Sequence, residues 1–220
     1  MPANPYVILH TSVTLDGSST GFMPDMELHY RLANGFEPDA NLIGSATVVE
    51  GQAMFGGPVP AEEEGDFDAP KRDPALPWWI VVDSAGKLEG LLHTCRRLEY
   101  CRDVIVLVSE STPASYLKHL EARRYRSIRA GSGKVDLRLA LSRLADEFGI
   151  GRIVTDTGPV LSGVLLNEGL VDEVSLLVHP IIKGGGSRNL MGEVHRDIAL
   201  TLDRAEAVGN GCVWLVYKRA

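Results

Sequence analysis

Residues 151–186, GRIVTDTGPVLSGVLLNEGLVDEVSLLVHPIIKGGG, contain the pattern that decides the fold of this chain. A short β-branched run at 152–155 is followed by Asp156-Thr157-Gly158-Pro159, which combines cap-type residues, a glycine and a proline suited to the first helical position. The pattern predicts a strand that feeds a helix ending at Gly169. A long strand over 173–182 and a glycine-rich loop follow.

The composition suits a single α/β domain over residues 1–220, since 45% of the residues are hydrophobic and 23% are charged. The net charge of −7 gives no broad positive surface for nucleic acid. No basic-then-apolar leader occurs, and no apolar run approaches the roughly 18 residues of a membrane span, so we expect neither secretion nor membrane insertion. Three cysteines without metal-type spacing indicate reduced thiols in a cytoplasmic protein and no metal site.

Strand and helix patterns alternate from residue 39 to residue 155, which predicts right-handed crossovers and a largely parallel sheet. A first strand over 5–13 precedes this region. The last 50 residues change character, because strand patterns at 173–182, 199–207 and 212–218 are joined by turns, and we expect them to add antiparallel strands. The clearest helix pattern, 136–148, is interpreted as a core-packing element only.

Polar turns follow the predicted parallel strands at Gly44, Asp83, Ser109 and Asp156. Ligands of open α/β sheets bind beyond the carboxyl ends of the strands, so we expect these turns to face one crevice. At Gly44-Ser45-Ala46-Thr47, with Ser45 as N-cap, the glycine, the hydroxyls and the helix dipole suit a phosphate, although a simple cap would look the same.

Three further features have less specific interpretations. Residues 56–77 hold five prolines and six acidic residues against two basic ones, which predicts a mobile surface flap that would repel phosphates. Asp16, in the turn after the first strand, could be an ordinary turn residue. His10, within that strand, is interpreted as a hydrogen-bonded core residue without a catalytic role.

Six motifs in sequence order resemble the dihydrofolate-reductase-like family that includes the reductase domain of riboflavin biosynthesis, and together they span nearly the whole chain. They are Ser12-Val13-Thr14-Leu15-Asp16-Gly17, Asp39-Ala40-Asn41-Leu42-Ile43-Gly44-Ser45-Ala46-Thr47, Ile80-Val81-Val82-Asp83-Ser84, Asp156-Thr157-Gly158-Pro159, Gly169-Leu170-Val171-Asp172-Glu173 and His179-Pro180-Ile181-Ile182-Lys183-Gly184-Gly185. The resemblance implies an α/β fold with three layers: a mostly parallel mixed sheet with antiparallel C-terminal strands, covered by helices.

The resemblance also implies an NADPH-dependent reductase that acts on a small ring or imine substrate, commonly as a homodimer. Asp16 and Asp156 would be its polar catalytic residues. The cofactor would contact Gly44, Ser45, Thr47, Asp83, Ser84, Thr157, Gly158, Pro159, Val160 and Leu161. Lys87 is a candidate for the adenosine 2′-phosphate. Because the deaminase motifs of the bifunctional proteins are absent, the chain would be a stand-alone reductase.

Three departures from the family pattern bear on the substrate. Ser18 stands where the riboflavin reductases usually place a lysine, Asp156 replaces a glutamate, and Thr157-Gly158 replaces a glycine pair that often has a cis bond. We therefore keep three readings open: a pyrimidine reductase that turns a ribosyl group into a ribityl one, a reductase of another substrate such as a pteridine, and a nucleotide-binding protein without catalysis.

Overall fold

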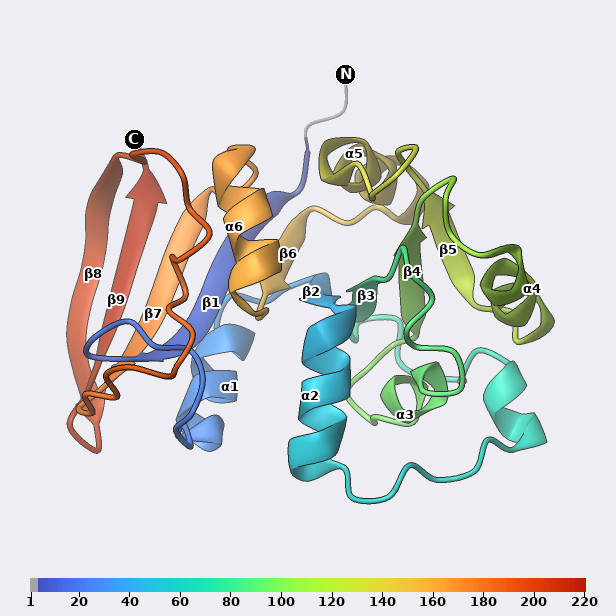
Figure 1. The fold of residues 1–220 in the computed structure, drawn as a ribbon, viewed down its shortest axis with the longest axis horizontal. Helices are drawn as coiled ribbons and strands as arrows, with labels where there is room; N and C mark the ends of the chain where they lie inside the picture. Colours follow the sequence, from blue (N-terminus) through green and yellow to red (C-terminus); the bar gives the residue numbers. More distant parts are fainter. Residues whose placement is uncertain (1–3) are drawn as a thin grey trace. The chain divides into compact units, whose positions relative to one another are not determined.

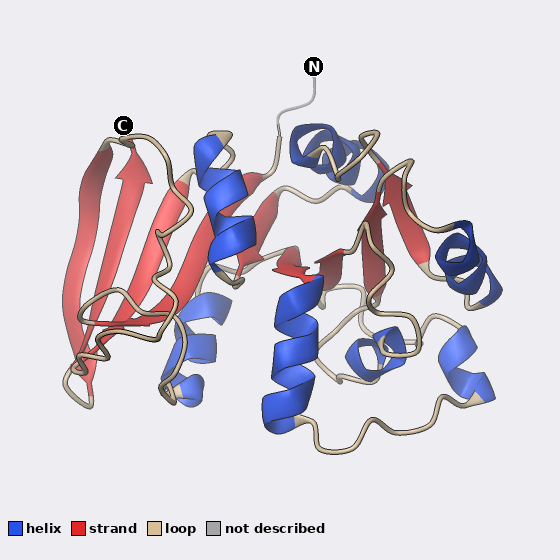
Figure 2. Ribbon diagram, in the orientation of Figure 1, coloured by secondary structure: helices blue, strands red, loops and turns tan. Residues whose placement is uncertain are grey.

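The computed structural model describes residues 4–220, which divide into two compact units (Figure 1). Residues Asp39–Gly151 form one of them, here called the central unit. Tyr6–Pro38 and Arg152–Ala220 form the other, here called the terminal unit. Both units contain paired strands and helices (Figure 2).

The strands described in the central unit are all parallel and lie in the order β5-β4-β3-β2. They are β2 (Ala40–Gly44), β3 (Trp78–Val82), β4 (Val104–Val108) and β5 (Arg126–Arg129). The helices are α2 (Ser45–Phe55), α3 (Leu92–Arg96), α4 (Ala114–Ala122) and α5 (Leu137–Phe148), with a 3-10 turn, η1 (Glu64–Phe67). Gly44 pairs with Val82, and Val82 with Leu107, so the turns after β2, β3 and β4 lie along one edge.

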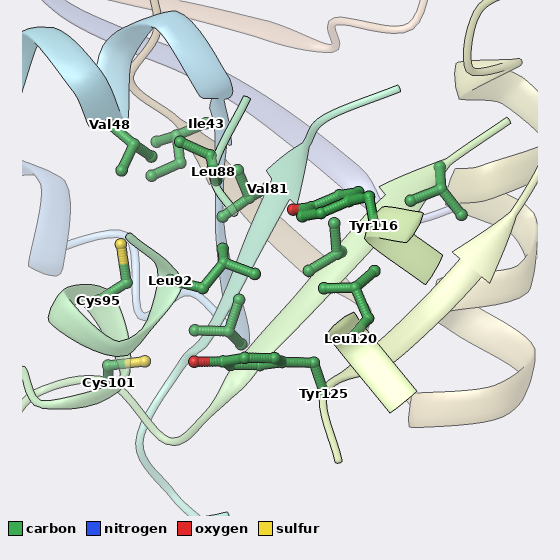
Figure 3. Close-up of a cluster of buried hydrophobic side chains, with 13 residues drawn as sticks. Ile43, Val48, Val81, Leu88, Leu92, Cys95, Cys101, Tyr116, Leu120 and Tyr125 are labelled. Atoms are coloured by element: carbon green, nitrogen blue, oxygen red, sulfur yellow. The ribbon is translucent and has the colours of Figure 1, made fainter. Parts of the chain in front are cut away.

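Helices cover both faces of the central sheet. On one face, α2, α3 and α4 pack their buried side chains against β2, β3 and β4 (Figure 3). That cluster includes Val48, Leu92, Tyr116 and Val81. Side chains alternate along a strand, so Trp78 points to the face opposite Val81. Its ring lies 5.5 Å from that of Phe148 in α5, which places α5 on the second face and gives three layers.

The terminal unit has a mixed sheet in the order β6-β1-β7-β9-β8. Its strands are β1 (Tyr6–Thr14), β6 (Arg152–Thr155), β7 (Glu173–His179), β8 (Leu200–Gly209) and β9 (Cys212–Arg219), and its helices are α1 (Met26–Asn34) and α6 (Pro159–Asn167). Strand β1 runs parallel to β6 and β7, whereas β9 is antiparallel to β7 and β8. The antiparallel pairing predicted for the last two strands is therefore confirmed, whereas β7 is parallel to β1 and antiparallel only to β9.

Helix α1 packs on one defined face of β1. Asp25 caps the helix, since its carboxylate accepts a hydrogen bond of 3.0 Å from the amide of Leu28. Ala33 of α1 lies in a small core cluster with Ile8 of β1 and Val154 of β6. Alternate residues of a strand share a face, so the side chains of His10 and Ser12 also point toward α1.

The alternation of strands and helices predicted from the sequence is confirmed, with differences at some boundaries. The short helix α3 has no clear sequence pattern and was missed. Ser45 is not the N-cap of α2: the helix begins directly at the end of β2, so Gly44 takes that position. The strand expected to reach residue 182 ends at His179. All peptide bonds among the described residues are trans, including that between Thr157 and Gly158.

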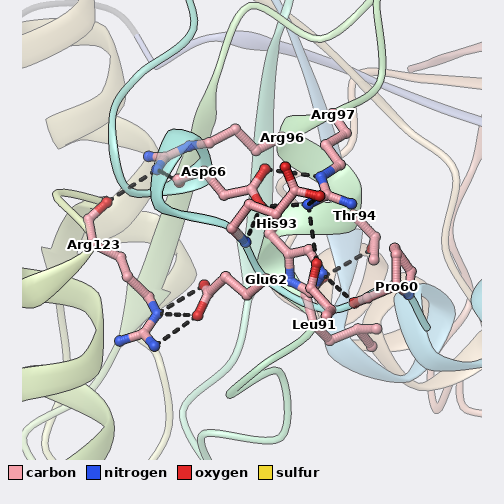
Figure 4. Close-up of polar contacts among 11 residues, drawn as sticks. Pro60, Glu62, Asp66, Leu91, His93, Thr94, Arg96, Arg97 and Arg123 are labelled. Carbon is pink, nitrogen blue, oxygen red and sulfur yellow. Dashed lines mark hydrogen bonds and ion pairs between the residues drawn. The ribbon is translucent and has the colours of Figure 1, made fainter.

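The acidic segment 56–77 is fastened to the central unit by ion pairs (Figure 4). Glu62 accepts two hydrogen bonds of 2.7 Å from Nε of Arg123. Asp66, which is 8% exposed, accepts hydrogen bonds of 2.8 and 2.5 Å from Arg97. Nε2 of His93 lies 2.9 Å from the carbonyl of Pro60. The segment thus has specific attachment points, while its mobility stays a prediction.

We expect Asp66→Asn to lower the free energy of unfolding by about 1–2 kcal/mol, because it weakens a buried, charge-assisted contact with Arg97. Cleavage of segment 56–77 by a protease should become faster. Asp68→Asn is the matched control, since Asp68 lies two residues away but is largely exposed in its pair with Arg124. Equal unfolding curves and equal cleavage rates for all three proteins would show that the Asp66 attachment is unimportant.

Candidate functional site

The predicted cofactor contacts of the central unit begin at the junction of β2 and α2. Gly44 is the N-cap of α2, so Ser45 and Thr47 lie in the first helical turn. No side chain makes an N-cap hydrogen bond to this helix. A helix start of this kind suits a phosphate group.

Asp83 and Ser84 form the next turn along the same sheet edge. Asp83 is buried, and its carboxylate accepts hydrogen bonds from the amides of Lys87, at 3.0 Å, and Leu88, at 2.9 Å. The carbonyl of Ser84 accepts a hydrogen bond of 2.9 Å from the hydroxyl of Thr112. The side chain of Asp83 therefore holds its own turn in shape, and any contribution to ligand binding comes through the backbone it orders.

The remaining predicted cofactor contacts form the start of α6 in the terminal unit. Gly158 is the N-cap with an extended backbone, Pro159 occupies the first helical turn, and no side chain caps this helix either. A Cβ built on Gly158 would meet nothing within 4 Å, so the backbone there is open to a close ligand approach. Thr157 is buried, and Val160 is exposed.

Asp156, between β6 and α6, forms an ion pair with His29 of α1. Its Oδ2 lies 3.1 Å from Nε2 of His29. The histidine side chain is 3% exposed and that of Asp156 is 38% exposed. The pair therefore presents a carboxylate to solvent on one side and is backed by a buried imidazole on the other. Sequence analysis selected Asp156 but not His29.

A chain of hydrogen bonds beneath this pair fixes the tautomer of His10. Nε2 of His10 lies 3.1 Å from the carbonyl of His29, which can only accept, so this nitrogen carries the proton. Nδ1 of His10 then accepts from the hydroxyl of Ser175 at 2.8 Å. The indole of Trp214 donates to the same hydroxyl at 2.8 Å. His10 is a hydrogen-bonded core residue, as expected from the sequence.

The second ring nitrogen of His29 also has a partner on β1. Nδ1 of His29 lies 3.0 Å from the hydroxyl of Ser12, which is buried. The hydroxyl donates to this nitrogen when the ring is neutral and accepts from it when the ring is protonated. His29 can therefore hold a hydrogen bond to Asp156 in both protonation states.

The charges of this cluster follow from burial and from the ring contacts. Burial, with the neighbouring His29 ring, lowers the pKa of His10 from 6.5 to about 4, so His10 is neutral near pH 7. Burial by itself would raise the pKa of Asp156. The charge and the hydrogen bond of His29 outweigh that effect and bring the Asp156 pKa below its usual value. Asp156 is therefore a carboxylate at neutral pH.

Asp16, the second predicted catalytic residue, has a different environment. Its carboxylate accepts hydrogen bonds from the hydroxyl of Thr14 and from the amides of Lys183, at 3.1 Å, and Gly184, at 2.8 Å. The Thr14 bond, followed by the two amides, lowers its pKa to about 2. Asp16 thus ties the turn after β1 to the glycine-rich loop after β7.

The structure does not bring the two predicted catalytic carboxylates together. Thr155, just before Asp156, pairs with Leu9 of β1, whereas Asp16 lies beyond Thr14 at the far end of that strand. Thr14 is the fifth residue after Leu9, which corresponds to about 16 Å along a strand. The two aspartates are therefore separate features, and they cannot share a proton as a carboxylate pair.

His29, Ser12, Ser175 and Trp214 are the polar residues of this cluster that sequence reasoning missed. One signal was available: His10 and Ser12 are two residues apart in a strand that is almost wholly buried, and so share a face. The partner of that face is not encoded locally, because His29 and Asp156 are 127 residues apart. Nowhere in residues 4–220 do three His, Cys, Asp or Glu side chains gather in a group that could hold a metal ion.

Comparison with known proteins gives consistent relatives. The sequence profile of the RibD C-terminal domain family matches residues 5–214. The chain is 31% identical over 223 residues to the 2,5-diamino-6-ribosylamino-4(3H)-pyrimidinone 5′-phosphate reductase of Methanothermobacter thermautotrophicus, an alignment that covers 95% of this chain and 96% of that protein.

Solved structures show the same fold at low sequence identity. A pyrimidine reductase-like protein of Corynebacterium diphtheriae superposes with a TM-score of 0.71 at 18% identity, over 98% of this chain and 92% of that one. The riboflavin biosynthesis reductase of Saccharomyces cerevisiae gives a TM-score of 0.68 at 18% identity, over 99% and 90% of the two chains. Among residues 4–220, no helix has both the length and the apolar character needed to cross a membrane.

We expect the free energy of unfolding to fall by about 2 kcal/mol between pH 7 and pH 5 because of His10 alone. The unfolded chain takes up a proton on this histidine near pH 6.5 and the folded protein only near pH 4, so acid favours the unfolded state within that window. Chemical denaturation at both pH values measures the effect.

His10→Gln is the matched variant, because an amide can replace both ring hydrogen bonds but does not titrate. The loss of stability between pH 7 and pH 5 should be smaller in this variant by about 2 kcal/mol. The same pH dependence in both proteins would mean that His10 is not buried in its neutral form.

Proposed function

Because this chain belongs to the RibD C-terminal domain family, we propose that it is an NADPH-dependent reductase of riboflavin biosynthesis. It reduces the ribosyl group of 2,5-diamino-6-ribosylamino-4(3H)-pyrimidinone 5′-phosphate to a ribityl group. The observation that carries this proposal is the 31% identity to the archaeal reductase over 95% of the chain. The solved structures support the fold only, because their identities are low.

The helix starts at Gly44 and Gly158 fit the phosphates of NADPH. Gly44 ends β2, and Gly158 lies three residues beyond the end of β6; no side chain makes an N-cap hydrogen bond to either helix. Such helix N-termini attract anions through their amides and their dipoles. Ser45 and Thr47 add hydroxyls to the first site. Thr157, Val160 and Leu161 flank the second. We propose that each helix start can hold a phosphate group, and bound NADPH would supply the hydride.

Asp156 is the proposed catalytic residue, and its role follows from the proton balance of the reduction. Opening of the ribosyl ring to an imine removes a proton from the exocyclic nitrogen of the substrate and adds one to the ring oxygen. Reduction at the C1′ carbon would then require the nitrogen to take a proton. A carboxylate can accept the nitrogen's proton in the first stage and return it in the second, while solvent protonates the ring oxygen.

We propose that Asp16 contributes to substrate binding at the far end of β1. Its carboxylate stays ionised and holds the backbone at Lys183 and Gly184. The ordered glycine-rich loop would then line the substrate site. This indirect role replaces proton transfer, which a carboxyl of such low pKa does not perform near neutral pH.

One observation favours a second candidate, a reductase of the same family whose substrate lacks a phosphate. Ser18, at the position of the expected lysine, is buried, and its hydroxyl lies 2.7 Å from that of Ser187. The residue is therefore used inside the protein and supplies no positive charge for a phosphate. A pteridine-like ring would be such a substrate. A nucleotide-binding protein without catalysis is the third possibility.

The molecular setting completes the proposal. The family profile spans both units, which supports a single reductase domain. The three cysteines are free and buried, which suits the reducing cytoplasm. The part of the terminal sheet formed by β7, β9 and β8 is a candidate homodimer interface. Leu176 and Val178 are only half-buried, and β8, at the sheet edge, is almost fully exposed.

The direct test is turnover of the purified protein with NADPH and the ribosylaminopyrimidinone phosphate, followed by the loss of reduced-nicotinamide absorbance. We expect one NADPH to be consumed for each ribityl product. NADPH binding without turnover of this compound, but with turnover of a pteridine, would support the second candidate. Binding without turnover of either compound would support the third.

Asp156→Asn is expected to lower kcat by about 10²- to 10⁴-fold, because the amide cannot accept and return the substrate proton. The dissociation constant of NADPH, measured by fluorescence titration, should change less than about twofold, since the reaction chemistry and the phosphate contacts are separate. A variant with the kcat of the wild type would exclude Asp156 as the proton-transferring group.

A further inference from the structure

We propose that His29 is a positioning residue for Asp156: it holds the carboxylate in the ionised form and in the orientation needed for proton transfer. This inference rests on the proposed function and adds a residue to it. It concerns a side chain of α1, outside the sequence motifs that suggested the reductase. The contact between Nε2 of His29 and Oδ2 of Asp156, at 3.1 Å, is the observation on which it stands.

The geometry assigns this role to His29 because both of its ring nitrogens are engaged. Nε2 faces Asp156 and Nδ1 faces the hydroxyl of Ser12 at 3.0 Å. With two fixed partners and only 3% of its side chain exposed, the ring has one orientation. A donor locked in this way fixes the carboxylate that it contacts, whereas a flexible side chain would not.

The hydrogen bonds that hold the backbone of His29 in place are equally specific. Nε2 of His10 donates to the carbonyl of His29, and Nδ1 of His10 accepts from Ser175, which accepts from Trp214. These bonds fasten the middle of α1 to β1, β7 and β9. Burying so many polar groups is costly unless each has its partner, so the arrangement has little freedom to rotate or shift.

Several titratable groups face His29 and set its electrostatic environment. Asp156 lies at the end of β6, His10 is on β1, and Tyr30 is the next residue of α1, with its ring 5.0 Å from that of His29. His179, at the end of β7, also senses the charge of His29. Among these groups, Asp156 is the one with a charge opposite to that of a protonated imidazole.

Loss of the His29 donor has a defined consequence for Asp156. Burial disfavours the charged carboxylate, and the charge and hydrogen bond of His29 oppose that effect. Without the imidazole, the pKa of Asp156 should therefore rise. Because the proposed reaction requires the carboxylate form, the acidic limb of the pH–rate profile should move to higher pH.

The test compares His29→Phe, which keeps a ring without a donor, with His29→Gln, which keeps a donor. In His29→Phe we expect the acidic limb of the kcat profile to move to higher pH by about one unit or more, kcat to fall by about 10- to 100-fold, and NADPH affinity to stay unchanged. His29→Gln should lie between His29→Phe and the wild type. Asn34→Ala, at the exposed last residue of α1, is the control expected to leave the profile unchanged.

A second measurement is independent of turnover. Titration of the Asp156 carboxyl by NMR in the protein without ligands should show a higher pKa in His29→Phe than in the wild type. If His29→Phe does not fold, His29→Gln and Ser12→Ala replace it, and both should raise the same pKa by a smaller amount. Equal Asp156 titration in the wild type and in the folded variants would overturn the inference.

The two proposals fail in distinguishable ways. Absence of turnover by the wild-type protein, together with an Asp156 titration that still depends on His29, would reject the proposed reaction and keep the pairing. Turnover by the wild type with kcat and pH profiles that are unaffected in His29→Phe would reject the positioning role and keep the reductase.

Discussion

The contact between His29 and Asp156 depends on one physical constraint: a polar side chain buried in a sheet must find a hydrogen-bonding partner. Strand β1 directs His10 and Ser12 into the layer between the terminal sheet and α1, where water cannot satisfy them. The helix meets this requirement with the backbone carbonyl and the ring of His29. Because that ring is then fixed from below, its remaining nitrogen points at the end of β6, where Asp156 lies.

The same constraint separates the roles of the two aspartates. Asp16 is exposed, but it is fully used by the hydroxyl of Thr14 and the amides of the loop after β7, so it works as an anchor. Asp156 makes its contact with a single buried ring and keeps part of its surface accessible. The second arrangement leaves a carboxylate that is oriented by a single buried ring and is open to a small molecule.

Attachment of loops by charged side chains is a second theme of the structure. In the central unit, Arg97 and Arg123, at the C-terminal ends of α3 and α4, hold the acidic segment 56–77 by its carboxylates and a carbonyl, and Asp83 closes its own turn through two amides. Segment 56–77 has the composition of a flexible loop, and Asp83 lies at the edge of the candidate ligand site. Both nevertheless have defined partners within the protein.

The sequence by itself determined the order of most strands and helices, the antiparallel C-terminal strands, the helix start at Pro159, and the family. These features depend on local periodicity, on caps and on short motifs, all of which are readable within about ten residues. It also selected Asp156. Only the tertiary structure decided that Asp16 and Asp156 lie apart, that Asp83 is turned inward, and that His29 contacts Asp156. Those outcomes depend on strand register and on contacts between residues far apart in the chain, which no local pattern encodes.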